Sequence, residues 1–363
     1  MKRLKEIVLS VVCFLFFSNF SFSGVKFYGE VKDPITNNLI SGVNVKLIGP
    51  NLQTTTTTPY QDFEGRNINF EINDVPRNSI FMIQCSKSGY VNTILPGGVG
   101  NSDTYISIPI ISQSFYTNNI HGGTAPSHQS GKADIAGSVE GPFGPVSGVV
   151  ISAKYIDNGQ TIPSSQIRYL GDNFIPGNYN STQNNGFFCI YNVEPKRPIL
   201  ITGTKTGFKF NQIITLGYPD SLTIGGIESI ENYVSIQGKV IDINENPVSG
   251  ANISIVGTNI STVSSSDGSF TLINVPPDSL LISKVSKSGY KDVYQNLYVE
   301  SEQIECIAVS SNFYNQILLQ IGQSHIQGKG DIGGSVGNIE GVVVKLYDYQ
   351  GNEVNVKVYY MDE

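Results

Sequence analysis

Three histidines are the residues of this chain best suited to bind a metal or transfer a proton, and none has the spacing of a known catalytic motif. A zinc peptidase needs a His-x-x-Glu pair and a distant third ligand, because catalytic zinc keeps three protein ligands and one open position. His121 precedes Gly-Gly-Thr, His128 precedes Gln-Ser-Gly and His325 precedes Ile-Gln-Gly. We therefore expect no metal site, and we expect each histidine to hydrogen-bond the nearby backbone.

An oxygen-rich segment gives a similar result. Asp242, Asn244 and Asn246 are spaced like calcium ligands, but the glycine and the closing glutamate of a calcium loop are missing. Asp and Asn in this pattern favour an Asx turn, in which a side chain accepts a hydrogen bond from the backbone two residues on. We expect neither catalytic residues nor a cofactor in this sequence.

Residues 169–180, rich in aromatic, Asn and Asp side chains, are the best candidate for a binding site. Carbohydrate sites on β-sandwiches combine an aromatic platform with amide or carboxylate hydrogen bonds, and loops on a rigid scaffold commonly carry binding residues. The chain has no Trp, so Tyr and Phe would form the platform. The candidate glycan-contact residues are Tyr169, Asp172, Asn173, Phe174, Asn178 and Tyr179. The alternative interpretation is an ordinary hairpin extension.

An internal duplication determines how these residues are arranged along the chain. Nine of the thirteen residues in segment 127–139 are identical in segment 324–336, and residues 112–116 resemble residues 311–314. A long-period repeat of this kind indicates an array of similar structural units. His128 and His325 are equivalent residues of different units, so we expect them to lie far apart.

Within one unit, apolar and polar residues alternate as they do in half-buried strands. The third unit shows this best, with expected strands at residues 237–240, 251–255, 269–272 and 280–286 and a hairpin turn at Asp267-Gly268. No helical periodicity interrupts them. The predicted fold class is all-β, with tandem antiparallel β-sandwiches and short junction helices.

The predicted organisation has seven segments. They are a signal peptide (1–23), a first sandwich (24–111), a junction helix with linker (112–130), a second sandwich (131–231), a third (232–310), a second junction helix (311–327) and an incomplete fourth sandwich (328–363). In the second helix, Phe313, Ile317, Leu318 and Ile321 share one face and Ser311 is the expected cap. The fourth unit is either part of a longer product or is completed by a partner strand.

The motifs of the third unit resemble those of a known family. Residues 238–290 contain Gly-x-Val, Pro-Val-Ser-Gly-Ala, Asp-Gly-x-Phe, Asn-Val-Pro-Pro and Lys-x-Gly-Tyr, a series similar to the carboxypeptidase regulatory-like domain. The resemblance extends as repeated units over nearly all of residues 25–363. It implies a transthyretin-like (prealbumin-like) sandwich, often grouped with carbohydrate-binding-like folds. Such modules accompany a catalytic zinc domain in metallocarboxypeptidases, and we identify no such domain here.

The first 23 residues indicate export. Three basic residues precede an apolar run at 7–17, and Ser21 and Ser23 fit the small positions of a signal-peptidase site. No later apolar run reaches the roughly 20 residues of a membrane-spanning helix, so we expect no membrane span in the mature chain. The expected location is the periplasm, the cell surface or the medium.

Charge argues against nucleic acid as a partner, and the cysteine positions argue against a disulfide framework. The net charge is −7 and only 15% of the residues are charged, without the basic stripe of a nucleic-acid-binding protein. Cys85, Cys189 and Cys306 occupy unrelated repeat positions, so we interpret them as small buried residues, with one disulfide as the alternative.

The sequence thus predicts an exported, non-enzymatic array of sandwiches that acts as a structural or adhesive module at the cell surface or in the periplasm. Its partner would be a polysaccharide or a cell-surface protein. Two alternatives remain open: a carbohydrate-binding protein that uses residues 169–180, and an accessory fragment of a larger secreted hydrolase.

Overall fold

The computed structural model describes most of the chain between residues 24 and 320. The described residues are 24–48, 54–61, 65, 67–77, 79–277, 280–299, 304–320, 323, 346–347 and 353–354. They fall into two compact units, with the division between Ser229 and Ile230. The predicted signal peptide, His325 and most of the predicted fourth sandwich lie outside the described residues; from the last, β27 (Leu346–Tyr347) pairs with β28 (Glu353–Val354).

The first sandwich packs two sheets around the inward side chains of alternating strands. In one sheet β1 (Val25–Lys32) lies between the antiparallel β6 (Phe70–Val75) and the parallel β9 (Thr104–Pro109). The other sheet contains β2 (Asn44–Ile48), β3 (Thr54–Thr56), β7 (Ser79–Ser86) and β8 (Asn92–Val99), and a small ribbon pairs β4 (Tyr60–Gln61) with β5 (Asn67–Ile68). Phe27 contacts both Phe70 and Phe81 in the core.

The second sandwich repeats this pairing. Its first strand β10 (Ala133–Gly141) lies between the antiparallel β14 (Phe187–Val193) and the parallel β18 (Ser221–Ile230). The same sheet also holds β11 (Gly144–Pro145), β13 (Ile167–Tyr169) and β16 (Lys209–Phe210), and the facing sheet holds β12 (Val150–Tyr155), β15 (Pro198–Thr204) and β17 (Gln212–Leu216). Two short 3₁₀ turns, η3 (Ser164–Gln166) and η4 (Asp172–Phe174), flank β13.

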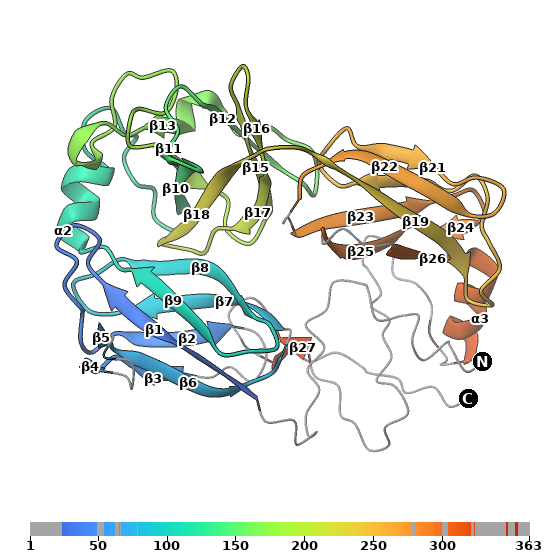
Figure 1. Ribbon diagram of the computed structural model, residues 1–363, viewed down its shortest axis with the longest axis horizontal. Coiled ribbons are helices and arrows are strands. Elements are labelled where there is room, and N and C mark those ends of the chain that lie inside the picture. The colour runs from blue at the N-terminus through green and yellow to red at the C-terminus, as the bar shows by residue number, and fades with distance from the viewer. Residues whose placement is uncertain are drawn as a thin grey trace. The chain divides into compact units, whose positions relative to one another are not determined.

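The third sandwich has the same plan once more. The strand β19 (Val234–Asp242) lies between the antiparallel β22 (Ser269–Val275) and the parallel β26 (Ile304–Ser310), which also pairs with β24 (Tyr290–Lys291). The facing sheet holds β20 (Asn252–Ile255), β21 (Ser261–Val263), β23 (Leu280–Ser286) and β25 (Val293–Tyr298). The strands predicted for this unit and the all-β fold class are therefore confirmed (Figure 1).

A shared bulge explains why an Asx-Val pair recurs in each unit. Asp74, Asn192 and Asn274 have positive φ angles of 57°, 55° and 59°, and each directly precedes the valine that pairs with the start of the first strand. The register of each first strand shifts at this point. Asp and Asn tolerate the left-handed conformation better than other residues with a side chain, which suits them to the positive φ of these three positions.

The first two sandwiches share one sheet. Strand β18 of the second pairs in parallel with β8 of the first, with Leu222 opposite Thr93, so that a ten-stranded sheet runs through both. Beside this pair a separate apolar cluster includes Val91, Tyr191 and Leu222. The two sandwiches therefore form one body, within the unit that ends at Ser229.

Helical turns follow the last strand of both the first and the third sandwich. After the third, α3 (Ser311–Gln320) is a helix over the first part of the predicted 311–327 segment, with Phe313, Ile317 and Leu318 half-buried on one face. The expected cap is corrected: the Ser310 hydroxyl, not that of Ser311, accepts from the Phe313 amide at 3.2 Å, because the helix already begins at Ser311. Ile321 lies outside the described residues.

Candidate functional site

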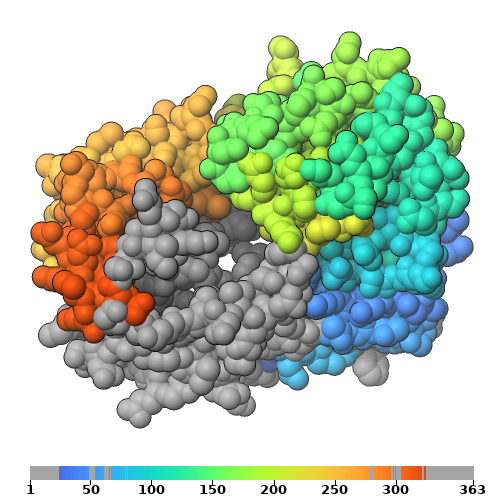
Figure 2. Space-filling model, turned by 180° about the vertical axis from the view of Figure 1, so that it is seen from behind, coloured from blue at the N-terminus to red at the C-terminus, as the bar shows by residue number. Residues whose placement is uncertain are grey.

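The segment between the first two sandwiches, residues 112–132 (the junction segment), contributes to a cluster of polar side chains around Asp134. It starts with α2 (Gln113–Phe115), whose cap Ser112 accepts from the Phe115 amide at 3.2 Å, and continues as a π-helical turn η2 (Tyr116–Ile120). Such turns insert an extra residue into the helix and are frequent at functional sites. Figure 2 shows the junction segment (teal) at the surface, between the first sandwich (blue) and the second (green).

The centre of the cluster is Asp134, whose side chain is 0% exposed. It lies at the bulge of β10, where the backbone turns this residue away from the sandwich core and toward the junction segment. Its Oδ1 accepts from the Asn192 amide at 2.7 Å, and its Oδ2 accepts from the Tyr116 hydroxyl and faces His121 Nε2 at 2.6 Å. A buried carboxylate needs this many partners because desolvation otherwise destabilises its charge.

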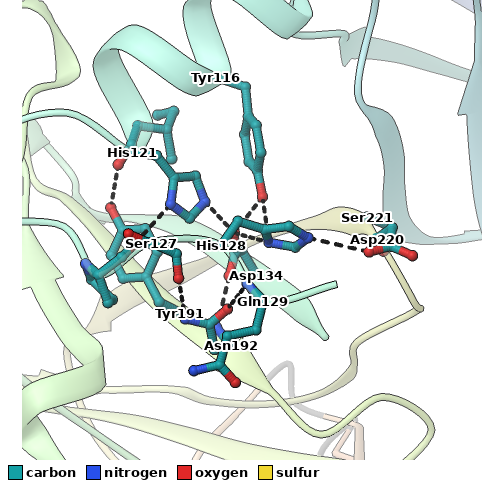
Figure 3. Close-up of polar contacts among 12 residues, drawn as sticks. Tyr116, His121, Ser127, His128, Gln129, Asp134, Tyr191, Asn192, Asp220 and Ser221 are labelled. Atoms are coloured by element: carbon teal, nitrogen blue, oxygen red, sulfur yellow. Dashed lines mark hydrogen bonds and ion pairs between the residues drawn. The ribbon is translucent and has the colours of Figure 1, made fainter. Parts of the chain in front are cut away.

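Two histidines of the junction segment approach Asp134 from different sides (Figure 3). His121 Nδ1 lies 2.9 Å from the carbonyl oxygen of Pro126, so this nitrogen donates, since a carbonyl can only accept. His128 Nε2 lies 3.2 Å from Asp220 Oδ1 and likewise faces an acceptor. The other ring nitrogen of His128, Nδ1, lies 3.3 Å from the Tyr116 hydroxyl and 3.6 Å from Asp134 Oδ2.

Strand β14 holds the junction segment in place. The Tyr191 hydroxyl donates to the Ile120 carbonyl at 2.6 Å, across from the His121 ring. Asn192 uses both ends of its amide, since Oδ1 accepts from the Gln129 amide at 2.8 Å and Nδ2 donates to the Ser127 carbonyl at 3.0 Å. The left-handed backbone at Asn192 thus serves both the bulge and the docking of the junction segment.

The electrostatics follow from burial and from the charge of Asp134. Burial acts to raise the pKa of Asp134, but the hydrogen bonds from His121 and Tyr116 outweigh it and the pKa is lowered. Burial acts to lower the pKa of His121, but the hydrogen bond and charge of Asp134 prevail and raise it. Burial, followed by the charge of Asp134, raises the pKa of Tyr116, which keeps its hydroxyl protonated as a donor.

The cluster brings together groups that can bind a metal ion. The ligand atoms of His121, His128 and Asp134 all lie within 4.8 Å of one another. Two imidazole nitrogens and one carboxylate oxygen form a common donor set for transition metals.

The expectations for the histidines are met only in part. His121 does contact the backbone, at Pro126, but it also contacts a buried carboxylate, and the contacts of His128 are with side chains. Sequence reasoning missed Asp134 and Asp220. A signal for Asp134 existed, because both it and His128 recur in the second copy of the repeat. Asp220 lies 92 residues from His128, and no local pattern connects them.

The proposed glycan-contact residues are not all at the surface. Tyr169 is 5% exposed, belongs to the core of the second sandwich and accepts from the Ile151 amide at 2.9 Å, so it is not available to a ligand. Phe174 is half-buried and packs against Phe115 and Phe187. Tyr179 is 43% exposed. The exposed polar members of the set are Asp172, Asn173 and Asn178.

Two smaller predictions are confirmed. Asp242 Oδ1 accepts from the amides of Asn244 and Asn246 at 2.8 and 2.9 Å, which makes an Asx turn. The described cysteines are free and buried, one in each sandwich: Cys85, Cys189 and Cys306. Burial raises the pKa of the Cys85 and Cys306 thiols to about 12, and it also raises that of Cys189.

Comparisons with known proteins identify the third sandwich. Residues 235–310 match the carboxypeptidase regulatory-like domain. The predicted resemblance is therefore confirmed for this part of the chain, which runs from β19 to the end of β26. No curated protein matches the chain.

Solved structures similar to the chain include two pilins and one further bacterial protein. The Bacillus anthracis TIE protein is 10% identical, and the match covers 80% of this chain and 51% of that chain with a TM-score of 0.20. The Streptococcal ancillary pilin is 9% identical, and the match covers 79% of this chain and 98% of that chain with a TM-score of 0.24. BcpA, the major pilin subunit of Bacillus cereus, is 12% identical, and the match covers 79% of this chain and 99% of that chain with a TM-score of 0.18. The chain spans about half the length of the TIE protein. Separately, no helix among the described residues has the length and apolar composition to cross a bilayer.

Proposed function

We propose that the chain is an exported, non-enzymatic structural or adhesive module, in which successive β-sandwiches display a surface outside the cytoplasm. The observation that carries the proposal is the shared sheet of the first two sandwiches. The parallel pairing of β8 with β18 and the apolar cluster around Leu222 hold these sandwiches as one body. A module that bears or positions a contact surface needs such rigid connections, whereas a flexible linker would not transmit orientation.

Two further features support the proposal. The third sandwich matches a regulatory-like domain, a kind of domain that accompanies catalytic domains and is not itself one. The N-terminal pattern of basic residues, apolar run and Ser21/Ser23 supports export.

Protease treatment of intact cells tests the location. Externally added protease should digest the chain while a cytoplasmic marker stays intact, and the purified protein should begin at Gly24. Attachment of cells to a surface or to other cells should weaken when the gene is deleted and recover when the full chain is restored. A chain that fractionates with the cytoplasm and keeps residues 1–23 would contradict the proposal.

Carbohydrate binding is the second candidate, and it now depends on Tyr179. This ring is exposed and lies beside the backbone of Gly171 and Gly177, with Asn178 next to it. A glycan array probed with the full chain tests the idea, with Tyr179→Ala as the variant. Tyr294→Ala is the matched control, because Tyr294 of the third sandwich is similarly exposed at 40%. Saturable binding lost only in Tyr179→Ala would support this candidate, and equal binding by both variants would contradict it.

A further inference from the structure

The polar cluster at the first junction brings together three side chains that could hold a metal ion. His121 Nε2 lies 2.6 Å from Asp134 Oδ2, and His128 Nδ1 lies 3.6 Å from the same oxygen. Ligands about 2.0–2.2 Å from a tetrahedral zinc ion are separated from one another by roughly 3.3 Å. The His128 pair already has this separation, and the His121 pair reaches it by a shift of less than about 1 Å.

The outer nitrogen of each imidazole is already oriented by an acceptor. His121 Nδ1 faces the Pro126 carbonyl at 2.9 Å, and His128 Nε2 faces Asp220 at 3.2 Å. Metal-binding histidines characteristically donate their second ring N–H to a carbonyl or a carboxylate, which fixes the tautomer and the ring orientation. Both inner nitrogens face the same oxygen of Asp134, and on binding an ion each would present its lone pair to the ion in place of a proton to Asp134.

Burial decreases across the cluster from Asp134 to Asp220. The Asp134 side chain is 0% exposed, those of His121 and His128 are 7% and 27% exposed, and that of Asp220 is 57% exposed. An ion would therefore enter past Asp220 and His128. The fourth position would be taken by water or by the Tyr116 hydroxyl, which already contacts Asp134 and His128.

The donor set selects the class of ion. Two imidazoles and one carboxylate suit zinc and its first-row neighbours. Calcium and magnesium prefer six or more oxygen ligands, which this cluster does not provide.

The second copy of the repeat differs at one ligand. Three residues of the cluster have counterparts there, since Tyr116, His128 and Asp134 correspond to Tyr314, His325 and Asp331, whereas Leu318 or Leu319 stands in place of His121.

We propose that His121, His128 and Asp134 bind one divalent transition-metal ion, with zinc as the reference ion. The ion would join two residues of the junction segment to strand β10 and so fix the junction between the first two sandwiches. This site goes beyond the proposed structural role, and its test does not depend on where the protein acts.

Calorimetric titration with Zn²⁺ tests the proposal on the full chain after chelator treatment and dialysis. The wild-type chain should bind one equivalent, and Co²⁺ should give the visible absorption of a tetrahedral nitrogen–oxygen site. His121→Gln and His128→Gln should each lower zinc affinity by at least about 100-fold, since each removes one of three ligands. Circular dichroism and a cooperative melt show whether these variants fold.

Two controls make the result specific. Asp220→Asn should weaken binding by about 10–100-fold, the size expected for a partner that orients a ligand. His325→Gln should leave one site of unchanged affinity, and Ca²⁺ should produce no saturable heat. The proposal is overturned if the folded wild-type chain shows no saturable Zn²⁺ binding at micromolar concentrations. It is also overturned if His121→Gln and His128→Gln bind as the wild type does.

Discussion

The second and third sandwiches build the same bulge and use it differently. In the third, the residue at the bulge is Ser235, which is exposed, and Asn274 takes the left-handed conformation opposite it. In the second, the corresponding residues are Asp134 and Asn192, and the junction segment covers both. The backbone of the bulge thus recurs in both sandwiches, whereas the polar cluster depends on the side chains at the bulge, which differ between them.

The first sandwich supports the same conclusion. Its bulge position is Lys26, which pairs with Glu71 at 3.1 Å near the surface. A partly exposed ion pair of this kind contributes little to stability. Among the three sandwiches, only the second has a fully buried charge at this position. Removing that charge should therefore destabilise the protein more than the equivalent substitution in the first or third sandwich.

Replacing Asp134 should have the largest effect. Asp134→Ala leaves His121 and the Asn192 amide without their buried partner, which should destabilise the docked junction by about 3–5 kcal/mol. Cys189 belongs to the apolar cluster beneath the junction segment, so its labelling by a thiol reagent reports this opening. In chelator, its labelling rate should rise at least about 100-fold.

The matched control is Ser235→Ala at the equivalent bulge of the third sandwich. Its effect on Cys306 labelling should stay within about 2-fold, because an exposed serine has no buried partner to lose. Equal effects of the two substitutions on their respective cysteines would show that the buried charge does not distinguish the sandwiches.

Opening a cavity at the shared sheet should have the next largest effect. Leu222 is 0% exposed and packs in the cluster that joins the first two sandwiches, so Leu222→Ala should cost about 3 kcal/mol. Cys189 should label faster while Cys306 does not change. The converse variant, Leu272→Ala in the third core, should accelerate only Cys306. Simultaneous acceleration of both cysteines in either variant would contradict separate cooperative units.

Substitutions of the two bulge asparagines, Asn192 and Asn274, distinguish the stability that comes from the backbone conformation from the stability that comes from docking the junction segment. Asn274→Ala should cost about 1 kcal/mol, because alanine lacks the short polar side chain whose local hydrogen bonding lets asparagine adopt the left-handed conformation. Asn192→Ala should cost about 2 kcal/mol more, because it also removes two hydrogen bonds to the junction segment. Glycine adopts this conformation freely, so Asn274→Gly should restore stability and Asn192→Gly should restore only part of it. Urea-dependent labelling of Cys189 and Cys306 measures both series, and full rescue by Asn192→Gly would disprove the docking role.

Local patterns predicted the sheets well because strand alternation and turn residues act over a few positions. The strands of the third sandwich and the Asx turn at Asp242 followed from such patterns. The polar cluster did not, because its contacts join residues far apart in sequence, such as Asp220 and His128. Within the predicted loop at residues 169–180, only the exposure of Tyr169 was wrong: its ring fills the core of the second sandwich, and composition alone does not show which aromatic residue points inward.

Replacing the helix caps Ser112 and Ser310 should have the smallest effect on stability, and the effect should be similar at the two helices. Ser112 and Ser310 each accept from the amide three residues on at 3.2 Å, so replacing either with alanine should cost about 1 kcal/mol. In hydrogen exchange, both substitutions should lower the protection of their own helix by about 5-fold.

The two helices should nevertheless start from different levels of protection. Opening the π turn exposes Tyr116 and Ile120, which are buried, whereas no described residue of α3 is fully buried. Wild-type amides at 116–121 should therefore exchange much more slowly than those at 314–320, because local opening is governed by the apolar surface it exposes. Equal protection of the two segments would mean that the burial of Tyr116 and Ile120 adds nothing to the stability of the junction segment.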